Sequence, residues 1–200
     1  MNVNVLKYLK HAAECEDTNF SSSLLQNYIL GSLKGFYEGK NKGESIPSAL
    51  GELAFLYSKE DINTQRITEF IEDVFSILSN TNQYIIGHIA NFMDIVLVHN
   101  PQIINFYLHK LKKNDKVKGD SAAILYSSVI YSALEHKVDL RSTLSHIEYP
   151  WRSYFKLANY YLYYNDNTSA LNYIIRAVKT CPVELKNEYT RKRDYIISSF

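Results

Sequence analysis

Glycine and proline are scarce in this sequence, with only 7 Gly and 4 Pro among 200 residues. Because these two residue types interrupt helices, their scarcity favours long helices joined by short connections. Cysteine is scarcer still: Cys15 and Cys181 are far apart in the chain and in no Cys-x-x-Cys spacing. This count excludes a disulfide framework and a cysteine-based zinc site, and we expect both thiols to be reduced and buried.

Long apolar runs are also absent, because Asn, Asp, His or Lys interrupts each of them well short of the ~18 residues of a membrane span. The first residues, MNVNVLKYLKHAAECED, lack the apolar stretch of a secretory signal. We therefore expect a cytoplasmic protein without a transmembrane helix. The formal net charge of +1 gives no reason to expect nucleic acid or an anionic membrane as a partner.

Motifs that carry common enzyme chemistry are missing as well. The sequence has no GxGxxG or GxxxxGK[ST] phosphate loop, no GxSxG elbow and no HExxH pair. His88 and His99 would share a helix face but lie ~16 Å apart along its axis, too far to hold one metal ion together. We predict no cofactor and no metal site.

Helical periodicity, by contrast, is present almost throughout. Between Asn63 and Leu78, apolar residues recur at steps of three and four, and Asn63 or Thr64 can cap the first turn. Pro47 stands where a first helical position is expected. The pattern predicts helices at about 3–15, 21–37, 47–59, 64–79, 82–98, 101–113, 120–136, 139–148, 151–164, 167–180 and 183–199.

Small residues recur in the middle of alternate predicted helices. Ala54, Ala90, Ser127 and Ala158 follow one another at intervals of 36, 37 and 31 residues. A period of this size is typical of solenoids built from helix pairs, in which a small residue lets two helices approach closely.

The segment 151–184 matches a known repeat at eight positions. These positions are Tyr154, Leu157, Ala158, Tyr161, Ala170, Ile174, Ala177 and Pro182. Their residue types and spacing resemble a tetratricopeptide repeat. Asn165 stands where the family often has Gly between its two helices, and Asn tolerates the left-handed conformation that this turn requires. The match covers about a sixth of the chain, and the pattern decays in the earlier helix pairs.

The resemblance implies an all-α fold, a right-handed α-solenoid of antiparallel helix pairs. We expect one domain over 1–200, with N-terminal helices at 1–43, degenerate helix-pair repeats at 47–150, the tetratricopeptide-like repeat at 151–184 and a capping helix at 183–200.

The resemblance also implies a function. Tetratricopeptide arrays bind a peptide or a partner helix in a groove lined by their first helices. The groove positions of the family fall here on Arg152, Phe155, Asn159, Leu162 and Tyr163, and Asn91 and Asp94 take the matching places beside Ala90. We therefore predict a non-enzymatic scaffold that binds another protein or peptide. Small solenoids of this kind commonly serve as adaptors, chaperones or immunity proteins.

Three alternatives remain open. Arg141 and His146 are spaced as in the HEPN ribonucleases, in which an Arg and a His cleave RNA without a metal. The tyrosine-rich stretch 160–164 could instead make the protein a homo-oligomer. The chain also has one basic run. We interpret it as a solvated helix end, and the alternative is a patch for an acidic partner or RNA. The run consists of Lys110, Lys112, Lys113, Lys116 and Lys118.

Overall fold

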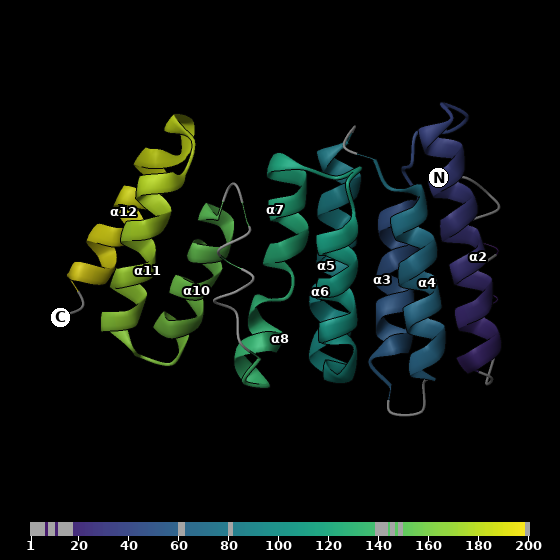
Figure 1. Cartoon of the computed structure of the whole chain (residues 1–200), viewed down its shortest axis with the longest axis horizontal. Coiled ribbons are helices and arrows are strands. Elements are labelled where there is room, and N and C mark those ends of the chain that lie inside the picture. The colour runs from purple at the N-terminus through teal and green to yellow at the C-terminus, as the bar shows by residue number, and fades with distance from the viewer. Residues whose placement is uncertain are drawn as a thin grey trace. The chain divides into compact units, whose positions relative to one another are not determined.

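The computed structural model describes residues 7, 11, 18–59, 63–79, 82–138, 144, 147 and 150–198. All regular structure in these residues is helical: ten α-helices and two short 3-10 helices are present, and no strand (Figure 1). The all-α prediction is therefore confirmed. None of these helices is long and apolar enough to cross a membrane.

The chain divides into two compact units, Met1–Val117 and Lys118–Phe200. The division falls inside the segment 47–150 that the sequence analysis treats as one series of helix pairs. The single domain over 1–200 stays a prediction, and each unit is described by itself below.

The first unit consists of five α-helices and one 3-10 helix. These are α2 (Thr18–Tyr37), α3 (Ile46–Tyr57), α4 (Thr64–Ile77), α5 (Gln83–His99), η1 (Pro101–Ile103) and α6 (Ile104–Lys113). Helix α3 packs on α5, while α2 packs on α4 and α4 on α6. Helix α2 also packs on α3 and so joins the two groups. The helices of this unit therefore form two layers, one of α3 and α5 and the other of α2, α4 and α6.

Helix starts in the first unit follow from the residues that precede them. The side-chain oxygen of Asn63 accepts a hydrogen bond from the backbone N–H of Gln65 at 2.9 Å, which caps α4. Asn82 caps α5 in the same way through the N–H of Tyr84, also at 2.9 Å. Pro47 lies in the first turn of α3, where its missing N–H leaves no intrahelical bond unmade. The predicted start signals at Asn63 and Pro47 are therefore confirmed, and the cap at Asn82 is an additional finding.

Large side chains fill the core of the first unit. The ring of Phe70 lies 6.5 Å from that of Tyr57 and 5.7 Å from that of Phe92, measured between centroids. All three are buried. The buried side chain of Asn100 donates hydrogen bonds to the carbonyls of Tyr57 at 2.9 Å and Val96 at 3.0 Å. This asparagine therefore ties the end of α5 to the end of α3.

The second unit consists of five α-helices and one 3-10 helix among its described residues. These are α7 (Gly119–Ser127), α8 (Ile130–Glu135), α10 (Trp151–Tyr163), α11 (Asn167–Thr180), η2 (Val183–Leu185) and α12 (Lys186–Ile197). Helix α10 packs on α7, α8 and α11, and α11 packs on α12. Helices α10 and α11 run side by side and are joined by a short loop (Figure 1).

The predicted helix 120–136 is in fact two helices, because the chain turns at Ser128 and Val129. The hydroxyl of Ser128 donates to the carbonyl of Leu125, and that of Ser127 to the carbonyl of Ile124, each at 2.7 Å. The N–H of Ser128 also bonds to the carbonyl of Leu125, three residues back. Paired serines that bond to the preceding turn bend and break helices.

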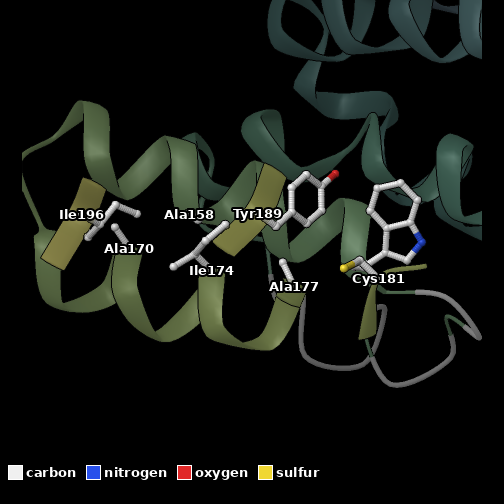
Figure 2. Close-up of a cluster of buried hydrophobic side chains, with 8 residues drawn as sticks. Ala158, Ala170, Ile174, Ala177, Cys181, Tyr189 and Ile196 are labelled. Atoms are coloured by element: carbon white, nitrogen blue, oxygen red, sulfur yellow. The ribbon is translucent and has the colours of Figure 1, made fainter. Parts of the chain in front are cut away.

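Small residues form the centre of the second unit (Figure 2). Ala158 of α10 and Ala170 and Ala177 of α11 have no exposed surface, and Ile174 fills the space between them. Larger side chains lie around this centre. Trp151, Cys181, Tyr189 and Ile196 are buried with the alanines in one cluster. The small side chains thus allow α10 and α11 to approach closely.

The turn between α10 and α11 has the geometry that the sequence predicts. Asn165 has φ 58°, in the left-handed region. Its N–H bonds to the carbonyl of Leu162 at 3.1 Å, and the N–H of Asp166 bonds to that of Tyr161 at 2.9 Å, which together form a Schellman motif. Asp166 then caps α11, since its carboxylate accepts from the N–H of Ser169 at 3.0 Å. The hydrogen bond from Ser169 lowers the pKa of Asp166 below its usual value.

Candidate functional site

A groove in the second unit lies between α8 and the C-terminal end of α10. It encloses about 340 Å³. Its lining consists of Tyr131, Glu135, Asn159, Tyr160, Tyr163 and Tyr164. Four of these six residues are tyrosines, so the groove presents aromatic ring faces, hydroxyl groups, one amide and one carboxylate.

Two local features place these side chains together. Asn159 and Tyr163 are four residues apart on α10, and Tyr160 is four residues before Tyr164, the C-cap of the helix, so each pair meets on one side of the helix. Tyr131 and Glu135 show the same spacing on α8. The groove is therefore built from two helical faces that meet where α10 packs on α8.

The tyrosine rings contact one another across the groove. Tyr131 and Tyr160 are stacked, with centroids 6.2 Å apart and planes at 26°. Tyr160 also lies 4.8 Å from Tyr164, and Tyr164 lies 5.2 Å from Tyr163. The outermost rings are open to solvent, with 80% of Tyr163 and 56% of Tyr164 exposed. A molecule in the groove would cover surface that the chain itself leaves bare.

The electrostatics of the groove come from neutral phenols and one carboxylate. Burial raises the pKa of Tyr160 above its usual value, and the neighbouring Tyr164 and Glu135 raise it further. Tyr160 therefore stays protonated well above neutral pH and can both donate and accept a hydrogen bond. Glu135 is the one acidic or basic side chain in the lining.

Two of the five residues predicted on α10, Asn159 and Tyr163, line this groove. Arg152 lies at the opposite end of the helix. Its Nε and Nη2 atoms lie 3.2 Å and 3.1 Å from the two carboxylate oxygens of Asp120 on α7. Its guanidinium also lies 4.1 Å from the centroid of the Trp151 ring. Arg152 thus joins α7 to α10.

Phe155 and Leu162 pack against the core cluster of the second unit. The Phe155 ring is stacked on that of Tyr189 in α12, with centroids 4.5 Å apart and planes at 6°. Burial raises the pKa of Tyr189 to about 12. Both predicted residues therefore contribute to the packing that holds α10 and its neighbours together.

The other two predicted residues, Asn91 and Asp94, belong to α5 in the first unit. Asn91 is exposed and Asp94 is half-buried. Their place in one binding surface with residues of α10 stays a prediction.

Arg141 and His146, the pair predicted for ribonuclease chemistry, lie outside the described residues. Their role therefore stays a prediction. Among the residues that the structure describes, no three His, Cys, Asp or Glu side chains are grouped so that they could hold a metal ion.

Two lysines of the basic run contact helix α4 in the first unit. Lys110 forms an ion pair with Glu72. The Nζ atom of Lys116 donates a hydrogen bond to the carbonyl of Ser76 at 3.0 Å. Folding therefore brings part of the basic run beside an acidic side chain of α4. The solvated helix end and the patch for an acidic partner or RNA both stay predictions.

Tyr131 and Glu135 are groove residues that the sequence analysis did not single out. Tyr160 and Tyr164 belong to the tyrosine-rich stretch 160–164, for which the sequence predicts self-association as one alternative. That stretch was the available signal, because five adjacent positions with four tyrosines cannot all be buried on one helix. Nothing in the local pattern around Tyr131 and Glu135 indicates that α8 faces the end of α10.

Comparison of the chain with protein-family models, with curated proteins and with solved structures finds no match in any of the three.

Proposed function

We propose that this protein is a non-enzymatic binding scaffold that holds a segment of another protein in the tyrosine groove of its second unit. The observation that carries the proposal is the groove itself, a hollow of about 340 Å³ whose outer rings, Tyr163 and Tyr164, are largely exposed.

Tyrosine suits this role for energetic reasons. Its rigid ring contributes a large contact area and loses little side-chain entropy on binding, and its hydroxyl remains able to hydrogen-bond. Tyrosine is accordingly enriched among the residues that dominate binding energy at protein interfaces. Asn159 adds an amide that can bond to the backbone of a bound segment. The lining thus combines ring faces for affinity with a few polar groups for orientation.

Helix packing supports a tetratricopeptide-like solenoid as the architecture of this scaffold. The periodic small residues Ala54, Ala90, Ser127 and Ala158 are all buried. In the first unit, the helices that carry Ala54 and Ala90 pack directly on each other. Such arrays place their first helices along the binding surface, and α8 and α10 belong to the predicted first-helix positions. We propose a right-handed array of antiparallel pairs in a cytoplasmic adaptor, chaperone or immunity protein.

Affinity capture with matched variants tests the proposed function. The wild-type chain is compared with Tyr163→Ala and Asn159→Arg as bait in a lysate of the cells that produce it. Tyr195→Ala is the control, because Tyr195 is also an exposed tyrosine of the second unit but does not line the groove. We expect one protein to be retained by the wild type and by Tyr195→Ala, and to be lost with both groove variants.

Calorimetry with the purified partner then measures how much binding affinity each groove variant has lost. Truncation of an aromatic residue that the partner covers at an interface hot spot typically weakens binding by about 2 kcal/mol, roughly thirtyfold in Kd. Equal affinity of the wild type, Tyr163→Ala and Asn159→Arg would contradict the proposal. Recovery of only a second copy of this chain would support self-association instead.

A further inference from the structure

Inside the second unit, one arginine side chain contacts both an aromatic ring and a carboxylate. At the start of α10, the Arg152 guanidinium lies 4.1 Å from the Trp151 ring centroid and bonds to both carboxylate oxygens of Asp120. A planar guanidinium can stack on a ring face and bond to a carboxylate through two N–H groups at once. This end of α10 therefore shows a complete site for an arginine side chain, and the chain itself supplies the arginine.

The groove at the other end of α10 has the same two components. Tyr160, Tyr163 and Tyr164 supply ring faces, and Glu135 supplies a carboxylate. Among the described residues, none forms an ion pair with Glu135. The Nζ atom of Lys156 lies 4.8 Å from the centroid of Tyr131, another ring of the lining, so a cation already approaches one groove tyrosine, but Lys156 does not line the groove.

The field at this end of α10 also favours a cation. Tyr163 is the last residue of the 13-residue helix, and the C-terminus of a helix carries a partial negative charge. The faces of the tyrosine rings are negative as well, because of the quadrupole of an aromatic ring. The carboxylate of Glu135, the helix end and the ring faces therefore act in the same direction.

We propose that the groove binds the guanidinium group of an arginine in the partner segment, stacked on the tyrosine rings and paired with Glu135. This inference rests on the proposed function and specifies what its groove recognises. Arginine fits better than lysine because its planar group can use a ring face and a carboxylate together, whereas an ammonium group acts as a point charge. A volume of about 340 Å³ accommodates a long side chain together with neighbouring backbone.

Peptide titrations monitored by NMR test this proposal. The probe is the blocked pentapeptide Ac-Ala-Ala-Arg-Ala-Ala-NH2, and its matched control carries citrulline, which has the same shape but no charge, in place of arginine. The protein carries ¹³C-labelled tyrosine rings, with resonances assigned by single Tyr→Phe substitutions. We expect the arginine peptide to shift the ring signals of the groove tyrosines. We expect the citrulline peptide to bind at least about fivefold more weakly, as loss of a charged hydrogen-bonding group predicts.

The Glu135→Gln variant isolates the carboxylate. It should weaken binding of the arginine peptide by about fivefold to tenfold. The control variant Glu184→Gln, at an exposed position of the same unit outside the groove, should leave binding unchanged. Four results would overturn the proposal: no shift with the arginine peptide, equal affinity for the citrulline peptide, unchanged affinity in Glu135→Gln, or shifts confined to tyrosines outside the groove.

The captured partner separates this proposal from the proposed function. A partner that depends on Tyr163 but binds Glu135→Gln as tightly as the wild type would refute arginine recognition and leave the scaffold function intact. A partner that is indifferent to Tyr163 and Asn159 would refute the scaffold function of the groove itself.

Discussion

The two units of this chain bury different kinds of side chains. In the first unit, the rings of Tyr57, Phe70 and Phe92 meet at the centre of the core. In the second unit, alanines occupy the centre between α10 and α11, and the half-buried Tyr154, Tyr161 and Tyr173 pack around them. The second core also buries Trp151 and Tyr189, but small residues rather than rings occupy the centre between its two helices.

This difference explains why the groove is found in the second unit. Ala158, Ala170 and Ala177 bring the backbones of α10 and α11 close together, and beside them the rings of Tyr161 and Tyr173 stack on each other between the two helices. The rings of Tyr160, Tyr163 and Tyr164 lie instead toward α8 and solvent. Aromatic surface therefore remains exposed beside the packed hairpin, at Tyr163 and Tyr164.

Removal of a ring from the first core should have the largest effect on stability. Phe70→Ala deletes a buried ring that contacts both Tyr57 and Phe92, and it enlarges a void that already measures about 10 Å³. We expect the free energy of unfolding to fall by about 3–5 kcal/mol. Urea denaturation followed by circular dichroism measures this change.

Phe55→Ala is the matched control for the first unit, because 60% of Phe55 is exposed. It should change stability by less than about 0.5 kcal/mol. Trp151 is the single tryptophan and belongs to the second unit, so its emission follows that unit separately. We expect Phe70→Ala to shift the transition seen by circular dichroism more than that seen by Trp151. Equal shifts would show instead that the two cores unfold together in one transition.

Enlargement of a small residue in the second core should have the next largest effect. Ala177→Leu inserts three carbon atoms where α11 meets α10 with no exposed surface. Overpacking of this kind destabilises by about 1–3 kcal/mol. Urea unfolding followed by the Trp151 emission measures this loss of stability. Thr168→Leu, at an exposed position of the same helix, should have little effect. A stable Ala177→Leu protein would show that the helices are not held at close approach.

Acidification should affect the second unit through Asp166, with the smallest of the three effects. The hydrogen bond from Ser169 lowers the pKa of Asp166 in the folded state, so the ionised carboxylate stabilises the fold. This contribution is fully present above the unfolded pKa of about 3.9 and is lost as the pH falls through the lower folded value. Asp166→Asn keeps a capping oxygen that does not titrate. We expect the Tm advantage of the wild type over Asp166→Asn to shrink below about pH 4. A constant difference between pH 7 and pH 3 would contradict this assignment.

Much of the local structure could be predicted from the sequence because its causes lie within a few residues. Asn63 caps α4, Asn165 adopts the left-handed conformation, and the apolar stripe of α4 is buried, each as predicted. The break at Ser128 was missed because the apolar periodicity runs on through it. Serine hydroxyls that bond back to the preceding turn leave no mark on a hydrophobic pattern.

The candidate site was harder to predict because its parts come from separate segments. Asn159 and Tyr163 were expected on a binding surface from family resemblance, and the structure shows them in one groove with Tyr131 and Glu135. The periodicity of a helix does not indicate which of two aromatic residues on it contacts another helix. Phe155 contacts Tyr189 of α12, while Tyr163, two turns away, is largely exposed.

The predicted helices 3–15 and 139–148 lie almost wholly outside the described residues. Over the described residues, the sequence by itself determined the helices, most of their ends and the small residues that face the interior, since propensity, capping and periodicity act over one or two turns. Only the tertiary structure decided that Arg152 pairs with Asp120, that Phe155 stacks on Tyr189 and that α8 faces the end of α10. These contacts join residues about 30 positions apart. They depend on how the helices cross and on where the chain bends between α7 and α8, and both are properties of packing rather than of any local stretch of sequence.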